Sequence, residues 1–310
     1  MSGRIEYEVV DMFADGPLTG CALGVVPDAA GLSDEEMAAV AREIGASETA
    51  FVLPATTPGV THRVRVFTPG GESPFGGHSA VGTAAALVRL GRLAAGQLVQ
   101  QCGERRQPVE ADPDGATLTA TGPLEVVPFD PVGPAEACGL RPEDVDGTAA
   151  TAGFGPAFHL LPVRPQALAR AALRPEHPVW RGQPDVLLFA WDAATRTARA
   201  RMFAPGYGMP EDPACASAAL ALGPWLVRAG LLPATTGSHP YRLRQGVELR
   251  RPAILACHVD VVDSRVTGAS VSGAVLPGAS GRMTLPAPTP APTTATAPAQ
   301  PEPTPEERPC

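Results

Sequence analysis

Apolar and polar residues alternate with a period of two along many short stretches of the chain. Residues 7–13 and 63–67 follow this pattern, and residues 21–26 and 186–191 are short apolar runs. Successive side chains of a β-strand point to opposite faces, so these stretches are predicted to be strands. Shorter segments of the same kind predict further strands at residues 98–101, 109–111, 118–121, 241–245, 254–262 and 271–275.

A helical period begins after the second of these strands. Met37 and Val40 are three residues apart and predict the buried face of an amphipathic helix. Ser33 is a suitable N-cap, and Glu36 three residues later completes a capping box. Gly45 is predicted to end the helix, because a helix C-terminus often needs a residue in the left-handed conformation.

The chain contains a duplicated unit. Residues 63–93 read as strand, Pro/Gly turn, small-residue loop and apolar helix, and residues 199–232 repeat this order. The shared Arg, Phe, Pro and Gly positions of the strand and turn lie 136 residues apart, and those of the helix end lie 139 apart. The second copy therefore has three extra residues in its loop. Ordered matches with one small insertion indicate duplication of a structural unit.

Each copy of the unit starts its helix with very small residues. The first start is Gly76-Gly77-His78-Ser79, and the second is Ala214-Cys215-Ala216-Ser217. The first N–H groups of a helix have no partner inside it and carry the positive end of its dipole. Small side chains let an anion approach these donors. Two such starts facing each other would bind a carboxylate and stabilise enolate-like charge, as an isomerase or epimerase requires.

The pattern predicts an α+β fold of two similar half-barrels, each wrapped around its own central helix. A shorter helix is expected at residues 167–173, and residues 143–146 are expected to form a loop or a short helix. Residues 286–310 are mostly Pro, Ala and Thr with a few charges, a composition that predicts a disordered tail.

Composition excludes several classes of function. The 310 residues carry a net charge of −8, which argues against binding nucleic acid or an anionic membrane. The chain has no Lys, which rules out a lysine Schiff base, a pyridoxal phosphate anchor and a P-loop lysine. The six Cys form no CxxC pair, so neither a zinc site nor a disulfide framework is indicated. With no signal-peptide pattern or long apolar run, a cytoplasmic location is expected.

Several motifs together resemble the phenazine-biosynthesis (PhzF-like) isomerase family. They span roughly residues 5–283 in the family's order and comprise Asp11-Met12-Phe13, Ala46-Ser47-Glu48-Thr49-Ala50-Phe51, Arg65-Val66-Phe67-Thr68-Pro69, Glu72-Ser73-Pro74-Phe75-Gly76-Gly77-His78, Glu211-Asp212-Pro213-Ala214, Gln245-Gly246 and Arg251-Pro252. The resemblance implies the diaminopimelate-epimerase fold, proton transfer within a small acid without a cofactor or metal, and a possible homodimer. It divides the chain into residues 1–121 with 265–285, residues 122–264, and the tail.

The resemblance also implies roles for single residues. Glu48 would be the catalytic acid/base, assisted by His78 and Asp212, while Gly76, Gly77, Ser79, Cys215, Ala216 and Ser217 would contact the substrate. Taken alone, Glu48 reads as a surface carboxylate, His78 as a helix cap, and Glu211 with Asp212 as a turn. The apolar residues that follow Glu48 suggest that its carboxyl group is buried. Burial would raise the pKa of this group towards neutrality, which suits a group that takes and returns a proton.

Two departures from the family pattern leave the substrate open. Cys21 stands where the family usually has Asn, and Cys215 with Ala216 stands where it usually has Thr-Gly. Cys215 occupies the position of one catalytic thiol of the related epimerases and racemases, but Gly76 occupies the other. A buried Cys is usually a small apolar residue, whereas a helix N-terminus lowers a thiol pKa.

Three functions follow as hypotheses. The leading one is a cofactor-independent isomerase in which Glu48 removes a proton from an activated C–H bond of a small carboxylic acid and returns it elsewhere. The richness in Ala, Pro and Arg indicates a high-GC source, where such proteins often belong to natural-product pathways, an association and not a derivation. The second is an epimerase or racemase that uses Cys215 and Glu48 from opposite faces. The third is a binding protein that kept the fold without catalysis.

Overall fold

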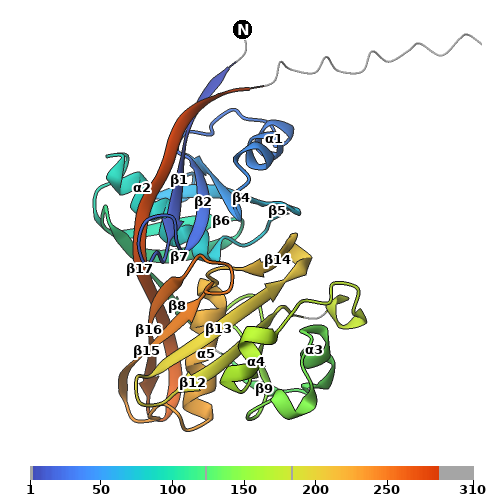
Figure 1. Ribbon diagram of the computed structural model, residues 1–310. Helices are drawn as coiled ribbons and strands as arrows, with labels where there is room; N and C mark the ends of the chain where they lie inside the picture. Colours follow the sequence, from blue (N-terminus) through green and yellow to red (C-terminus); the bar gives the residue numbers. More distant parts are fainter. Residues whose placement is uncertain (1–2, 123, 183, 286–310) are drawn as a thin grey trace, which may run out of the picture.

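The computed structural model describes residues 3–122, 124–182 and 184–285, except for the side chains of His78 and Tyr207. Figure 1 shows two strand-rich halves, one above the other, with the last strand running along both. The strands of the described residues form one continuous hydrogen-bonded sheet that curves around each half. The predicted α+β architecture is therefore observed, and the tail prediction lies outside the described residues.

The first half contains two helices and most of the strands from the N-terminal part of the chain. The helices are α1 (Asp34–Ile44) and α2 (Gly77–Arg89). The strands are β1 (Arg4–Met12), β2 (Cys21–Val26), β3 (Glu48–Leu53), β4 (His62–Thr68), β5 (Gly71–Ser73), β6 (Gly96–Cys102), β7 (Arg105–Ala111) and β8 (Gly115–Thr121).

The second half repeats this order with shorter connecting helices. Its helices are α3 (Val132–Ala137), α4 (Pro165–Arg170) and α5 (Ala216–Arg228), and its 3₁₀ turns are η1 (Pro142–Asp144), η2 (Pro178–Trp180) and η3 (Pro205–Tyr207). Its strands are β9 (Val127–Pro128), β10 (Ala150–Ala152), β11 (Phe158–Pro162), β12 (Val186–Asp192), β13 (Thr197–Ala204), β14 (Met209–Asp212), β15 (Gly237–Gln245), β16 (Ala253–Val262) and β17 (Arg265–Thr284).

Strand pairing confirms the duplication that the sequence predicts. In the first half β2 pairs with β3 in parallel, β3 with β4 antiparallel, and β4 with β6 in parallel. In the second half β11, β12, β13 and β15 repeat the same three pairings in the same order. In each copy the central helix connects the two strands of the second parallel pair along the chain: α2 comes between β4 and β6, and α5 comes between β13 and β15. The two halves are thus equivalent element by element.

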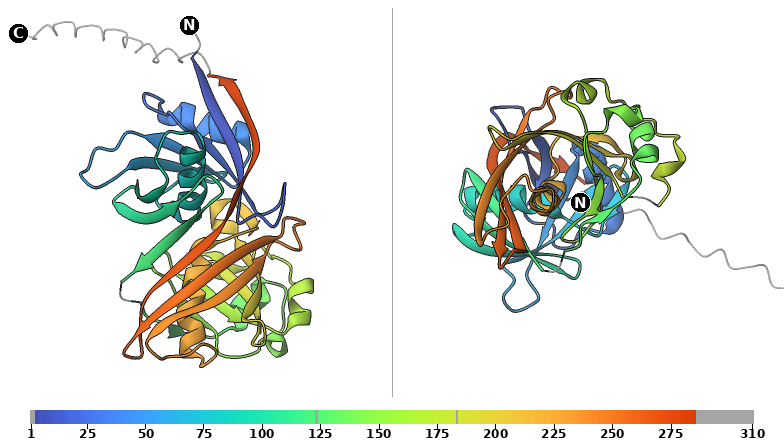
Figure 2. Two further views of the ribbon diagram at one scale, coloured as in Figure 1. Left: turned by 90° about the vertical axis from the view of Figure 1, so that its left-hand side faces the viewer. Right: turned by 90° about the horizontal axis from the view of Figure 1, so that it is seen from below.

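Helices α2 and α5 occupy the centre of the molecule. Helix α2 packs on β1, β7 and β8, and α5 packs on β10, β11 and β16. Viewed from below, α5 is seen nearly end-on with strands around it (Figure 2). Their small and apolar side chains share one core, while two smaller cores lie under α1 and under α3 with α4. Each half-barrel is therefore filled by its own helix, as predicted.

The sequence predicts the ends of helix α1 correctly but not the end of helix α4. Ser33 accepts the N–H of Glu36 at 3.2 Å, Glu36 accepts the N–H of Ser33 at 2.9 Å, and Gly45 takes φ 67°, so the predicted caps of α1 are confirmed. The helix expected at 167–173 instead ends at Arg170. The carbonyls of Leu168, near its end, and of Ala171, its C-cap, accept hydrogen bonds from the Arg201 guanidinium.

Strand β17 is much longer than the predicted segment 271–275. Residues 265–272 pair with β16, residues 268–274 pair with β8, and residues 275–284 pair with β1. The sequence of β17 alternates only weakly and so predicts a shorter strand. Hydrogen bonds from its long partner strands extend it. Because β17 serves both halves, the domain bounds stay a prediction. Among the described residues, no helix combines the length and apolar character needed to span a membrane.

Candidate active site

The two predicted helix starts meet. Gly77 is the first residue of α2, and a Cβ atom at this position would lie 2.2 Å from Ser217 Oγ of α5 and 2.5 Å from Phe75 Cε1. Any larger residue would separate the two helices, which explains the very small residues at these starts. The positive ends of both helix dipoles therefore face one small volume.

A cavity of about 50 Å³ lies at this junction, enough for only a few water molecules. Three carboxylate residues, Glu48, Asp185 and Asp212, contribute to its wall. The rest of the wall is formed by Ser73, Phe75, Gly77, Pro156, Phe158, Met202, Ala204, Met209, Cys215 and Ser217. Acidic groups, helix N-termini and an apolar enclosure are thus combined in one place.

Glu48 is the first residue of β3 and is buried. The strand is central, because β2 pairs with it on one side in parallel and β4 on the other side antiparallel. Leu23 is the register partner of Glu48 in β2. The apolar run that follows Glu48 keeps the strand in the core and so fixes the backbone from which the carboxylate reaches the cavity.

Asp212 ends β14 and is also buried. Its Oδ1 accepts the N–H of Ala214 at 2.9 Å and the Cys21 thiol at 3.8 Å. Glu211 points elsewhere and forms two hydrogen bonds with the Arg201 guanidinium, of 2.9 and 2.7 Å. Of the two neighbouring acids, Asp212 is therefore the one at the cavity, as the family resemblance implies.

Two buried glutamines hold the backbone at the helix starts. Gln245 donates to the carbonyl of Asp212 at 2.6 Å and accepts the N–H of Cys215 at 3.4 Å. Gln107 donates to the carbonyl of Gly76 at 2.9 Å, so each loop is fixed by an amide from a neighbouring strand. The resemblance singled out Gln245 without a role, and Gln107 was missed because such a long-range contact leaves no local pattern.

Cys215 is the N-cap of α5 and lines the cavity. Burial raises the pKa of its thiol well above the ordinary value, and the charges of Asp212, Asp185 and Glu48 raise it further. Of the two interpretations of Cys215, the raised pKa favours the buried apolar residue over an activated thiol, since desolvation and three carboxylates outweigh the effect of the helix N-terminus.

Other predicted residues lie close to the cavity without lining it. Gly76, Ser79 and Ala216 are buried behind the helix starts, and none of them lines this cavity or the larger one beside it that is described below. A Cβ at Gly76 would lie 2.8 Å from Ser79 Oγ, so Ser79 packs on the loop backbone. Direct substrate contact is therefore not supported for these three residues. His78 is the second residue of α2, and its side chain lies outside the described part of the structure.

Asp185 is a member of the site that the sequence reading missed. It precedes β12, and its carbonyl accepts the N–H of His159 at 2.9 Å. Burial, followed by the charge of Asp212, raises the pKa of its carboxyl to about 7. A weak signal was present: an acid stands at the start of an apolar stretch ahead of each copy of the duplicated unit, Glu48 ahead of the first and Asp185 ahead of the second.

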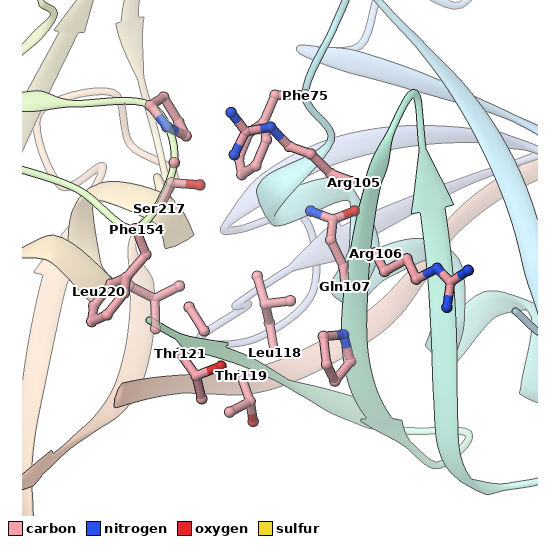
Figure 3. Close-up of a pocket in the computed structure, with 14 residues that line it drawn as sticks. Phe75, Arg105, Arg106, Gln107, Leu118, Thr119, Thr121, Phe154, Ser217 and Leu220 are labelled. Carbon is pink, nitrogen blue, oxygen red and sulfur yellow. The ribbon is translucent and has the colours of Figure 1, made fainter. Parts of the chain in front are cut away.

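A second cavity of about 290 Å³ adjoins the first, and the two share Phe75, Pro156 and Ser217 as walls. The Arg105 guanidinium stacks over the Phe75 ring at 5.3 Å to the ring centre. Figure 3 shows Arg105 between Phe75 and Gln107, with Ser217 on the facing side and Arg106 pointing away. Polar side chains from β8, Thr119 and Thr121, lie at the far end.

Known proteins are similar to this chain in both sequence and fold. The family model described as phenazine biosynthesis-like protein matches residues 10–126 and 148–278. A trans-2,3-dihydro-3-hydroxyanthranilate isomerase of Pseudomonas aeruginosa is 33% identical over 287 residues, which cover 90% of this chain and 99% of the relative.

Solved structures agree. A PhzF-family phenazine biosynthesis protein of Bacillus anthracis superposes with a TM-score of 0.77 at 22% identity, covering 91% of this chain and 99% of its own. A predicted epimerase of P. aeruginosa superposes with a TM-score of 0.74 at 30% identity and with the same coverage.

The duplicated half-barrels and the acid-lined junction of their central helices define an isomerase with the diaminopimelate-epimerase-like fold. The chain belongs to the phenazine biosynthesis-like (PhzF) family.

Proposed function

We propose that the protein moves a proton between two carbons of a small, unsaturated carboxylic acid, without a cofactor, in natural-product metabolism. The observation that carries this proposal is the position of Glu48, a buried carboxylate in the cavity where the two helix N-termini meet. A base beside fixed N–H donors is the arrangement that proton abstraction next to a carboxylate requires.

The geometry supports a division of roles. Glu48 removes a proton from an activated C–H bond, and the electron pair spreads into the substrate's conjugated system. The N–H groups at the starts of α2 and α5 stabilise the negative charge that develops there. Asp212, held by the N–H of Ala214, and Ser217 orient the bound acid, and His78 assists as the family resemblance implies.

The substrate is proposed to be a cyclic unsaturated acid. The P. aeruginosa relative is named for trans-2,3-dihydro-3-hydroxyanthranilate, and this compound is therefore the first to test. The inner cavity is too small for a whole ring acid, so part of the substrate would occupy the outer cavity beside Arg105 and Phe75. A guanidinium there suits a carboxylate or another polar ring substituent.

The test is proton exchange in D₂O with trans-2,3-dihydro-3-hydroxyanthranilate, followed by NMR. Glu48→Gln is expected to lower isomerisation by roughly 10²- to 10⁴-fold, the usual contribution of a general base. Glu43→Gln, at the exposed end of α1, is the matched control and should leave the rate unchanged. If Glu48→Gln turned over as fast as this control, the reading of a binding protein or of a different base would replace the proposal.

The thiol-dependent racemase is the second candidate and is disfavoured by the raised pKa of Cys215. Its partner position holds Gly76, which carries no thiol. Cys215→Ser is expected to keep most of the isomerase activity. Loss of deuterium wash-in at an amino-acid α-carbon in this variant would instead support a racemase.

We further propose a homodimer, as the family resemblance implies, and a cytoplasmic location, as expected from the sequence pattern. Light scattering on the purified protein measures the oligomeric state, and a monomeric mass at all concentrations would contradict the dimer.

A further inference from the structure

The two halves of the molecule place one acid each at the same structural position. Thr49, the residue after Glu48, pairs with Phe67 in the neighbouring strand. Val186, the residue after Asp185, pairs with Phe203. Phe67 and Phe203 occupy the same position of the duplicated unit, so Glu48, the first residue of β3, is equivalent to Asp185, the residue before β12.

Both acids reach the same cavity. Glu48 and Asp185 line it together with the buried apolar side chains of Met202 and Phe158. They approach from different halves of the molecule, because β3 belongs to the first and β12 to the second. A substrate bound between the halves would therefore meet Glu48 from the first half and Asp185, beside Asp212, from the second.

We propose that Asp185 is the second catalytic residue of the site: Glu48 removes the proton from one carbon of the substrate, and Asp185 delivers a proton to another. This inference rests on the proposed function. It adds a separate donor, so the proton that leaves and the proton that arrives use different groups.

The surroundings of Asp185 suit a donor. Desolvation and the neighbouring Asp212 raise the pKa of the Asp185 carboxyl to about 7, so a large fraction holds a proton near neutrality. The other titratable groups described at this cavity are Glu48, Asp212 and Cys215, and His159 lies on the adjacent strand β11. The three carboxylates cannot all carry charge cheaply in so small a volume, which favours a proton on one of them.

The step balances without any co-reactant. The C–H bond breaks, its proton forms an O–H bond on Glu48, and its electron pair enters the conjugated system of the substrate. That system forms a new C–H bond at the distal carbon with the proton of Asp185, whose O–H electron pair stays on the carboxylate. After product release Glu48 loses its proton to water and Asp185 regains one, which restores the starting state.

The experiment separates the two halves of the reaction in D₂O with trans-2,3-dihydro-3-hydroxyanthranilate. In Asp185→Asn, the recovered substrate should still gain deuterium, because Glu48 removes and returns its proton, while isomerised product should fall by ~10²-fold or more. In Glu48→Gln, both exchange and isomerisation should be lost. Asp185→Glu keeps a carboxyl group and should recover part of the isomerisation.

Asp192→Asn, at the other end of the same strand, is the matched control and should behave as the wild type. The inference is overturned if Asp185→Asn isomerises at the wild-type rate, or if folded Asp185→Asn loses exchange and isomerisation equally. It is also overturned if Asp185→Glu is no better than Asp185→Asn. Exchange that persists in Glu48→Gln would refute the proposed function itself, whatever the result at Asp185.

Discussion

At the scale of single residues, the site depends on carboxylates held where their charge is costly. Asp185 has a folded pKa of about 7 against an ordinary value of 3.8, so the folded protein binds its proton more tightly than the unfolded chain does. Between these two values the folded state carries more protons, and stability therefore falls as the pH rises. The full cost is present above pH 7, and it is absent below pH 3.8.

The first prediction follows from this sign. Asp185→Asn cannot ionise, so relative to wild type it should be more stable at pH 8, on the order of 4 kcal/mol, and gain less than about 1 kcal/mol at pH 4. Urea unfolding at both pH values measures the difference. Asp192→Asn is the control of opposite sign, because hydrogen bonds from Thr195 and from the N–H of Ala194 lower the pKa of Asp192. An equal effect of Asp185→Asn at pH 4 and pH 8 would contradict the prediction.

Single residues also show where sequence reasoning succeeded and failed. Gly77, Cys215 and Ser217 could be predicted near one another because small residues recur at both helix starts, and Glu48 through its family motif. Asp185 was missed because it lies 137 residues after Glu48, whereas the matching strand and turn residues of the duplicated unit lie 136 residues apart. Its equivalence to Glu48 becomes visible only when strand register aligns the two halves.

At the scale of elements, duplication explains why the helices could be predicted and the connecting segments could not. Helices α2 and α5 are long, apolar and preceded by turns, so their sequence pattern is strong. Strands β9 and β10 have two and three residues and follow Pro- and Gly-rich segments, so no period can develop. They pair with each other, and this tertiary contact decides their conformation.

The second prediction concerns the packing of α5 on the sheet. A Cβ at Gly223 would lie 2.9 Å from Val259 Cβ and 2.8 Å from the Tyr241 hydroxyl, which donates to the carbonyl of Ala219 at 2.7 Å. Val259 is a strand residue with little freedom to move, so Gly223→Ala should destabilise the protein by ~1–3 kcal/mol despite better helix propensity. Thermal unfolding measures this.

The control for that prediction is another helical glycine with space beside it. A Cβ at Gly133 of α3 would lie 3.6 Å from Val179 Cγ2, an ordinary contact. Gly133→Ala should therefore be neutral or stabilising by up to about 1 kcal/mol. If both variants had the same melting temperature, close packing at Gly223 would not be what requires glycine there.

At the scale of the whole molecule, function needs the two halves in one fixed relation, because each contributes part of the cavity. Strand β17 crosses between them, and a side-chain contact adds to it. Arg251, between β15 and β16, donates to Asp11 Oδ1 of β1 at 2.5 Å and to the carbonyl of Gly20 at 2.8 Å. The next residue, Cys21, contacts Asp212, so this contact connects the interface with the site.

The last prediction tests this connection. Arg251→Ala leaves the buried Asp11 carboxylate without its guanidinium, which should destabilise the protein by ~3 kcal/mol. It should also lower kcat, because the loop before Cys21 loses two of its hydrogen bonds.

The control is Arg282→Ala, which removes an exposed ion pair between β17 and Glu6, a residue of the strand β1 that also carries Asp11. This variant should cost less than about 1 kcal/mol, with kcat unchanged. Adding Asp11→Asn to Arg251→Ala should restore part of the stability, because the uncompensated charge is gone, but should not restore kcat, because the Gly20 contact is still missing. Recovery of kcat together with stability would show that the arginine acts on the fold alone and does not position the site.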